Sequence, residues 1–137
     1  MSYLLDTNVC IALLNADRPA VHGHFVKACA ASIPIFVSSV AIFELWYGVV
    51  KSTRRKMNQE RLDLFLAGPI EVLPFQQQDA IEAGGIRRTL EVAGKPIGYY
   101  DLLMAGQAIA NGLTLVTANT SEFARVKGLR CLDWSKA

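Results

Sequence analysis

The sequence predicts a single α/β domain in which helices cover both faces of a mainly parallel sheet of about five strands. Short apolar segments alternate with longer segments whose apolar residues recur at helical spacing. The links between the first four predicted strands are each long enough for a crossover helix, as parallel strands require. A chain of 137 residues, 52% hydrophobic and 19% charged, is long and apolar enough for one domain with its own core.

The first half of the chain predicts two strands and four helices. Thr7 or Asn8 is expected to cap the first helix, and Ser38 or Ser39 the third, because these short polar side chains accept hydrogen bonds from free backbone N–H groups. In chain order the predicted elements are a strand at 3–5, helices at 8–16 and 18–32, a strand at 33–40, and helices at 40–51 and 57–67.

The second half predicts three more strands and two helices. Ile81, Ile86 and Leu90 are expected to point inward from one helix. Asp101 is expected to begin the other, and Gly112 to end it, since glycine favours the left-handed conformation just after a helix. The predicted elements are a strand at 70–75, helices at 76–93 and 101–111, a strand at 113–117, a loop at 118–123 and a strand at 129–134.

Several acidic or amide side chains lie where the strands end or the helices begin. Asp6 follows the first strand, Glu44 interrupts an apolar helix face, Asp101 opens a helix, and Asn119 and Glu122 follow the strand at 113–117. The carboxyl ends of parallel strands meet at one edge of a sheet, where α/β proteins place their sites. We therefore expect these five side chains to converge.

Each of these residues also has an ordinary structural explanation. Asp101 could be a helix cap, Asp6 a turn residue, Glu44 an outward-facing side chain and Glu122 a solvated one. Together, however, carboxylates on one side of a sheet repel one another, and a hard cation such as Mg²⁺ or Mn²⁺ removes that conflict. Such a site is suited to hydrolysis of phosphate esters.

Other chemistries lack the residues they need. The only histidines, His22 and His24, lie in "VHGHF", which favours a surface position over a catalytic one, and no GxxxxGK[ST] or GxSxG motif is present. Cys10, Cys29 and Cys131 form no CxxC pair and indicate three buried thiols in a reducing compartment. With no apolar run long enough to span a bilayer, we expect a cytoplasmic protein.

Three stretches of the chain form a familiar series: "YLLDTNVCIALL", "SSVAIFELWYGVVKS" and the C-terminal run from "GKPIGYYDLL" to "LDW". Together they resemble PIN-domain ribonucleases, and specifically the VapC toxins of bacterial toxin–antitoxin pairs, and the resemblance spans the chain. It implies a single PIN domain over residues 1–137, folded as a three-layer α/β/α sandwich. It also implies a Mg²⁺-dependent endoribonuclease, with Mn²⁺ as a substitute, that is neutralised by a VapB-type antitoxin and acts as a homodimer.

The resemblance assigns roles to the converging acids. Asp6 and Asp101 would be the principal metal ligands and Glu44 the third acid. Many PIN domains carry an aspartate where this chain has Asn119, with Glu122 three residues later, so one metal ion is at least as consistent with the sequence as two. The implied reaction is in-line attack of a metal-activated water on an RNA phosphodiester, leaving a 5′-phosphate and a 3′-hydroxyl.

Further residues are candidates for binding substrate. Thr7, Asn8 and Thr117 flank the implied metal ligands. The segment 51–61, which includes Arg54 and Arg55, carries five basic side chains against one acidic, a local charge of +4 that either collects the RNA backbone or is simply solvated.

Aromatic side chains form a second group of binding candidates. Tyr47, Tyr99 and Tyr100 could stack on bases, whereas Trp46 is expected in the core or in an antitoxin groove.

Two other functions use the same residues. One is a structure-specific DNA nuclease, and the other is a non-catalytic PIN-like module that only binds a protein or an RNA. The second gives no reason for Asp6, Glu44 and Asp101 to occur together. Among RNA substrates, the resemblance to enteric relatives suggests a tRNA.

Overall fold

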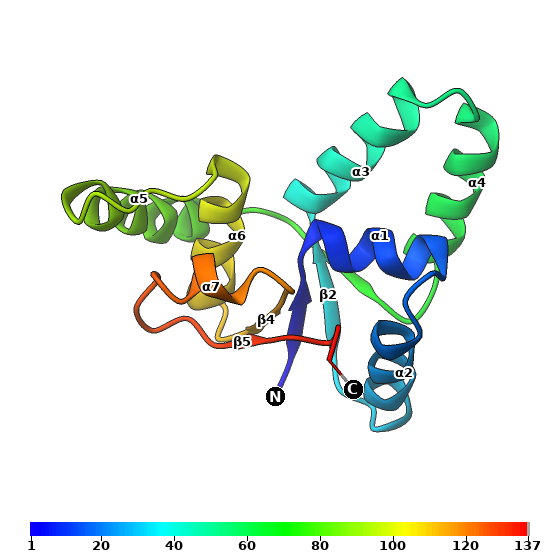
Figure 1. The fold of residues 1–137 in the computed structure, drawn as a ribbon, viewed down its shortest axis with the longest axis horizontal. Helices are drawn as coiled ribbons and strands as arrows, with labels where there is room; N and C mark the ends of the chain where they lie inside the picture. The colour runs from blue at the N-terminus through cyan, green and yellow to red at the C-terminus, as the bar shows by residue number, and fades with distance from the viewer. Residues whose placement is uncertain (137) are drawn as a thin grey trace.

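A five-stranded, entirely parallel sheet runs through the centre of the structure, a computed structural model that describes residues 1–136 (Figure 1). The order across the sheet is β3-β2-β1-β4-β5, so the first strand of the chain lies in the middle. In register, Leu4 pairs with Phe36 on one side and with Leu115 on the other. The strands are β1 (Tyr3–Leu5), β2 (Ile35–Ser38), β3 (Glu71–Leu73), β4 (Thr114–Val116) and β5 (Cys131–Leu132).

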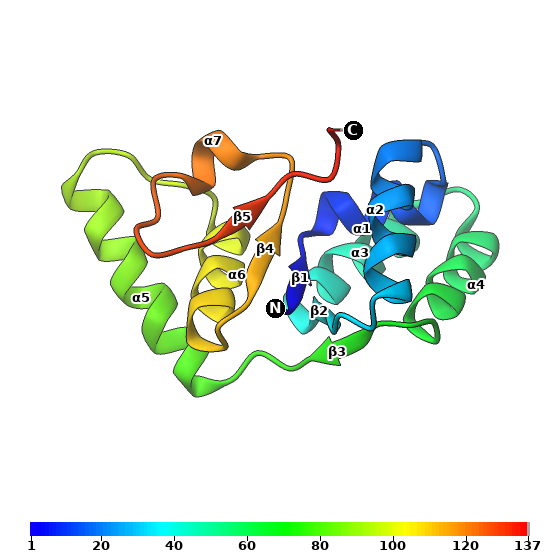
Figure 2. The same ribbon diagram turned by 90° about the horizontal axis from the view of Figure 1, so that it is seen from below.

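Helices cover both faces of this sheet. Figure 2 shows α1 to α4 on one side of the strands and α5 and α6 on the other. None of the helices within residues 1–136 is long and apolar enough to cross a membrane. The helices are α1 (Thr7–Asn15), α2 (Pro19–Ala30), α3 (Ser39–Lys51), α4 (Arg55–Leu66), α5 (Gln77–Val92), α6 (Tyr99–Ala110) and α7 (Thr120–Phe123).

The core consists of two apolar clusters, one on each face of the sheet. Because successive side chains of a strand point to opposite faces, Tyr3 and Leu5 of β1 join the cluster under α1 to α4, whereas Leu4 joins the cluster under α5 and α6. Phe123 of α7 also packs into the second cluster. The three-layer α/β/α sandwich is therefore confirmed.

Helix starts are where the structure departs most from the sequence-based expectations. Asp6, rather than Thr7 or Asn8, caps α1, because its extended backbone lets the carboxylate accept a hydrogen bond from the third helical N–H group. Ser38, as expected, caps α3. The last long helix begins at Tyr99 and not at Asp101, and Gly112 follows its end with a positive φ of 65°. The predicted loop at 118–123 contains the short helix α7.

Some predicted core positions are wrong. Ile81 is 59% exposed, because α5 packs on α6 through Ala83 and Leu90 and turns Ile81 to solvent. Cys10 is fully buried, but Cys29 and Cys131 are only partly buried, so the expectation of three buried thiols holds for one.

Helices α5 and α6 approach each other unusually closely at Gly106. A Cβ atom placed on this residue would lie 2.6 Å from the backbone nitrogen of Ala83 and 2.8 Å from its Cα. Nearby, buried Asp79 accepts a hydrogen bond from Asn111 at 2.9 Å, which ties the ends of the two helices together. Gly106 thus fixes the spacing of the layer that carries Asp101.

Replacing Gly106 with alanine is expected to destabilise the protein by about 2–3 kcal/mol, because the added methyl group meets backbone atoms that cannot move aside. Gly84→Ala is the matched control on α5, where nothing lies within 4 Å of an added Cβ, and should stabilise by about 0.5–1 kcal/mol. Urea denaturation measures both. Equal stability of the two variants would contradict this packing.

Candidate active site at the carboxyl edge of the sheet

The predicted acids meet at the carboxyl edge of the sheet. Asp6 lies at the end of the central strand β1, and Asn119 follows β4, its neighbour in the sheet. Glu44 lies in the second turn of α3, which leaves β2 directly, and Asp101 is the third residue of α6. Figure 1 shows α1 and α3 leaving the sheet at the same end.

Asp6 is the most enclosed of these side chains, with 5% of its surface exposed. Its Oδ1 accepts a hydrogen bond from the N–H group of Val9 at 2.9 Å, and its own N–H group donates to the carbonyl of Val116 in β4 at 3.0 Å. Burial raises the pKa of its carboxyl and the charge of Glu44 adds to this, while hydrogen bonds from Thr117 and Val9 oppose it. Asp6 is therefore held rigidly, and its hydrogen bonds offset only part of the cost of burying its charge.

Glu44 faces α1 rather than the core or open solvent. The hydroxyl of Thr7 donates to its Oε1 at 2.7 Å, which joins the first turn of α1 to α3. Glu44 is half-buried, between exposed Phe43 and buried Leu45. This position agrees with the expectation that Glu44 is not an ordinary solvent-exposed side chain.

Asp101 experiences the charge of every other acid in the group. Burial raises the pKa of its carboxyl to about 6, and the negative charges of Glu122, Asp6 and Glu44 contribute in that order. A Cβ atom placed on Gly98 would lie 3.5 Å from Oδ2 of Asp101, at ordinary van der Waals distance. Four carboxylates from four separate segments thus share one region.

Asn119 and Glu122 form a linked pair at the β4 side of the site. The amide of Asn119 donates to Oε2 of Glu122, and its backbone N–H group donates to Oγ1 of Thr117 at 3.0 Å. Thr117 is fully buried and also donates to Asp6. One chain of hydrogen bonds therefore runs from Asp6 to Glu122.

The donor atoms suit a hard divalent cation. Within residues 1–136, no three His, Cys, Asp or Glu side chains lie close enough to form a complete metal site. Three of the acids are instead engaged by protein donors: Asp6 by Val9 and Thr117, Glu44 by Thr7, and Glu122 by Asn119. Even so, the mutual repulsion that raises the pKa of Asp101 is what a cation among oxygen ligands would relieve, so the residues fit Mg²⁺ or Mn²⁺.

A groove of about 620 Å³, here called the aromatic groove, opens beside Thr7 and Glu44. Phe43 and Tyr100 pack edge to face across it, with ring centroids 5.6 Å apart. The Nζ atom of Lys51 lies 4.9 Å from the centre of the Tyr47 ring. Tyr47 and Tyr100 were sequence candidates, whereas Phe43, which is 56% exposed, was not among them.

The remaining candidates lie in three different places. Arg54 and Arg55 are exposed at the connection between α3 and α4, beyond Lys51 at the end of α3, and the structure does not bring them into the site. Asn8 is exposed on the first turn of α1. Trp46 is partly buried against the core cluster under α1 to α4, in agreement with its expected core position.

Comparison with known proteins gives consistent matches along the whole chain. A family model of the PIN domain matches residues 3–129. Ribonuclease VapC2 of Rickettsia felis is 39% identical over 136 residues, which cover 99% of this chain and 100% of that protein. The tRNA(fMet)-specific endonuclease VapC of Shigella flexneri is 37% identical, covering 98% of this chain and 99% of that protein.

Solved structures agree with these sequence matches. The VapBC2 complex from Rickettsia felis, bound to a promoter DNA fragment, contains a chain with a TM-score of 0.91 and 37% identity, covering 98% of this chain and 99% of that one. The DNA-bound VapBC complex from Salmonella typhimurium gives 0.89 and 36%, covering 98% of both chains. With the PIN fold, the acid-lined edge and these matches together, the chain belongs to the PIN-domain family and, within it, to the VapC ribonucleases.

Proposed function

We propose that this chain is a divalent-metal-dependent endoribonuclease toxin, one PIN domain over residues 1–137 that acts in the cytoplasm. The observation that carries the proposal is the gathering of Asp6, Glu44, Asp101 and Glu122 at one edge of the sheet, where their charges raise the pKa of Asp101. Relatives of similar length named as VapC ribonucleases support it.

Asp6 and Asp101 are the residues we propose to hold the metal ion, with Mg²⁺ as the physiological ion and Mn²⁺ as a substitute. When bound, the ion would polarise the scissile phosphate and lower the pKa of a water. Glu44 fixes the first turn of α1 through Thr7, which keeps Asp6 in place. Asn119 orients Glu122 through a hydrogen bond from its amide.

Hydrolysis proceeds in this proposal by in-line attack of water on the phosphorus atom. A carboxylate of the site that is not bound to the ion accepts the water proton. The 3′-oxygen of the RNA leaves, which produces a 3′-hydroxyl and a 5′-phosphate.

The aromatic groove supports a single-stranded region of RNA as the substrate. Its exposed rings Phe43, Tyr47 and Tyr100 offer faces on which bases stack, and Lys51 supplies a positive charge for the backbone. The name of the Shigella flexneri relative, a tRNA(fMet)-specific endonuclease, supports a tRNA loop as the site of cleavage. Arg54 and Arg55 would then contact more distant phosphates.

A VapB-type antitoxin is the proposed protein partner, since two similar structures are VapBC complexes. A groove of about 220 Å³ between α1, α3 and α4 has the apolar lining that an antitoxin helix would need, with Leu14, Leu45 and Leu62 among its residues. It shares Ile11 and Glu44 with the aromatic groove, so a docked helix would end next to the acids. The homodimer implied by the resemblance stays a prediction.

Asp6→Asn is expected to lower RNA cleavage at least about 100-fold, because a lost metal ligand removes several kcal/mol of transition-state stabilisation. Asparagine caps helices as well as aspartate does, so the fold should persist. Asp63→Asn, an exposed change on α4, is the matched control and should cleave normally. Equal activity of the two variants would refute the assignment, and faster cleavage of DNA than of RNA of the same sequence would favour a DNA nuclease.

Removing divalent ions with EDTA should stop cleavage, and adding excess Mg²⁺ or Mn²⁺ should restore it. Because the cation relieves repulsion only in the folded state, Mg²⁺ should also raise the melting temperature of the parent protein. Calorimetric titration of the parent and of Asp6→Asn compares their metal affinities. RNA cleavage that persists in EDTA would contradict the proposed site.

The raised pKa of Asp101 predicts a pH effect on stability in the absence of metal. Its folded-state pKa of about 6 exceeds the ordinary value of 3.8, so the folded protein holds this proton more tightly than the unfolded chain. The contribution of this group to the free energy of unfolding is therefore present below about pH 4 and is lost as the pH rises to about 6. Asp101→Asn should melt at a higher temperature than the parent at pH 7 in EDTA, with a smaller difference at pH 4. A pH-independent difference would argue against the shift.

A further inference from the structure

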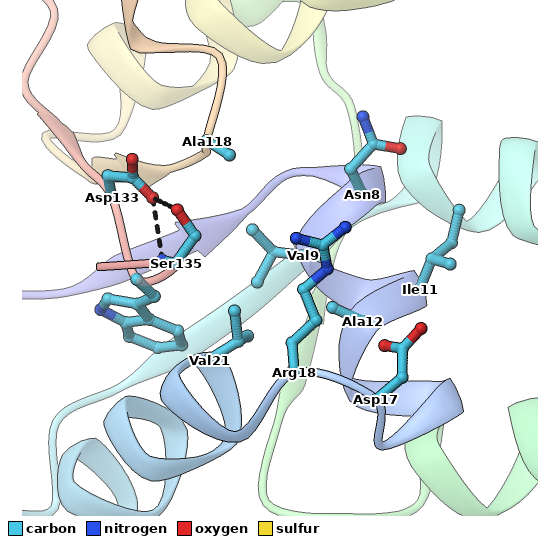
Figure 3. Close-up of a pocket in the computed structure, with 11 residues that line it drawn as sticks. Asn8, Val9, Ile11, Ala12, Asp17, Arg18, Val21, Ala118, Asp133 and Ser135 are labelled. Atoms are coloured by element: carbon cyan, nitrogen blue, oxygen red, sulfur yellow. Dashed lines mark hydrogen bonds between the residues drawn. The ribbon is translucent and has the colours of Figure 1, made fainter. Parts of the chain in front are cut away.

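A second hollow lies on the other side of Asn8 from the aromatic groove. This cavity of about 300 Å³, here called the tail pocket, is enclosed by α1, the connection between α1 and α2, and the C-terminal residues 133–135 (Figure 3). Asn8 and Ile11 line both hollows, so the two are continuous along the surface of α1. The residues that line it from α2 and from the C-terminal segment have no role in the proposed reaction.

The floor of the tail pocket is apolar and fixed. Val9, Val21 and Trp134 are buried, with exposed fractions of 5%, 3% and 2%. The Trp134 ring is held between two others, edge to face with Tyr3 at 5.5 Å and stacked on His24 at 6.1 Å. The pocket is therefore formed before any ligand arrives, and a flat apolar ligand would meet a rigid surface.

The rim carries one guanidinium, that of Arg18, and two carboxylates, that of Asp17 beside it and that of Asp133 on the tail side. Arg18 lies at the start of α2, makes no ion pair within residues 1–136, and in Figure 3 extends its guanidinium across the view between Asn8 and Ser135. On the tail side, Oδ1 of Asp133 accepts hydrogen bonds from the N–H group of Ser135 at 2.8 Å and from its hydroxyl at 2.6 Å. These bonds lower the pKa of Asp133 and fix its carboxylate as an ionised acceptor.

The pocket also opens next to the reacting phosphate of the proposed function. Ala118, one of its lining residues, is bonded directly to Thr117 and Asn119, and Asn8 follows Asp6 by two residues. A phosphate held at the acids would thus have a neighbouring base within reach of this cavity.

Guanine is the base whose hydrogen-bonding edges match both sides of the rim. Its O6 and N7 atoms accept two hydrogen bonds from an arginine, and its N1–H and N2–H groups donate to a carboxylate. Adenine would turn the N1 acceptor toward Asp133, and pyrimidines lack N7. We propose that the tail pocket binds a guanine next to the scissile phosphate, with Arg18 on O6 and N7 and Asp133 on N1 and N2. This inference rests on the proposed ribonuclease function and names a determinant of its sequence preference.

The experiment begins with an RNA library randomised around one cleavable position, digested by the parent protein and sequenced at the new ends. Enrichment of guanine at one position adjacent to the cleaved bond is the expected result. Short RNAs that carry guanine, 7-deazaguanine or inosine at that position are then compared by kcat/KM. Each analogue should lower kcat/KM by about tenfold, since one buried donor or acceptor loses its partner.

Two variants link these atoms to residues of the chain. In Arg18→Ala the penalty for 7-deazaguanine should disappear, and in Asp133→Asn the penalty for inosine should disappear, while each variant keeps the other penalty. Arg18 makes no side-chain cap on α2, so its removal should leave the helix intact. Lys27→Ala, an exposed change at the far end of the same helix, is the charge-matched control and should keep both penalties.

The outcomes separate this inference from the function on which it rests. If the parent protein cleaved no RNA at all, the ribonuclease proposal itself would be overturned. Cleavage with no base preference, or with a preference that Arg18→Ala and Asp133→Asn both retain, would overturn the guanine pocket alone. If Arg18→Ala weakened binding of an antitoxin but changed no analogue penalty, the tail pocket would be a protein contact instead.

Discussion

Repulsion between carboxylates at one edge of the sheet is the constraint on which the rest of the site depends. The fold brings Asp6, Glu44, Asp101 and Glu122 together from four segments, and their charges act on one another. Hydrogen bonds from the protein offset part of this cost, through Val9 and Thr117 at Asp6 and through Thr7 at Glu44. A cluster of carboxylates of this kind lowers the stability of the folded chain, and the same negative charge gives the site its affinity for a cation.

The surrounding structure is rigid where the acids need support. Asp6 is at once the end of the central strand, the cap of α1 and a hydrogen-bond partner of Thr117 behind β4. Asp101 is carried on α6, whose spacing from α5 is set by the missing side chain at Gly106. Both proposed metal ligands are thus attached to the two apolar clusters of the core, so changes in either layer reach the site.

The sequence predicted the order of strands and helices because its apolar residues follow the periods of those elements. It predicted the converging acids because each follows a strand, begins a helix or, in the case of Glu44, interrupts an apolar helix face. It could not choose the cap of α1, since Asp6, Thr7 and Asn8 are all suitable capping residues and only backbone geometry decides between them. Ile81 was misplaced because α5 is weakly amphipathic and packs mainly on one neighbour.

Other features left no signal in the sequence at all. The short helix α7 has four residues, too few for a helical period to be visible. The tail pocket combines residues near position 18 with residues near 133, and neither segment contains an unusual motif. Its lining depends on the C-terminal residues, which pack back against α2. There, Nε2 of His24 lies 2.9 Å from the carbonyl oxygen of Lys136.

The central place of β1 in the sheet also has a consequence for synthesis of the protein. β1 is synthesised before β2 and β4, and it pairs with β2 on one side but with β4, more than 100 residues later, on the other. Asp6 therefore cannot meet Thr117, Asn119 and Glu122 until those residues have emerged from the ribosome, and contacts this distant in sequence form late in folding. A nascent chain that ends just before residue 117 carries Asp6, Glu44 and Asp101 but cannot assemble the nuclease site.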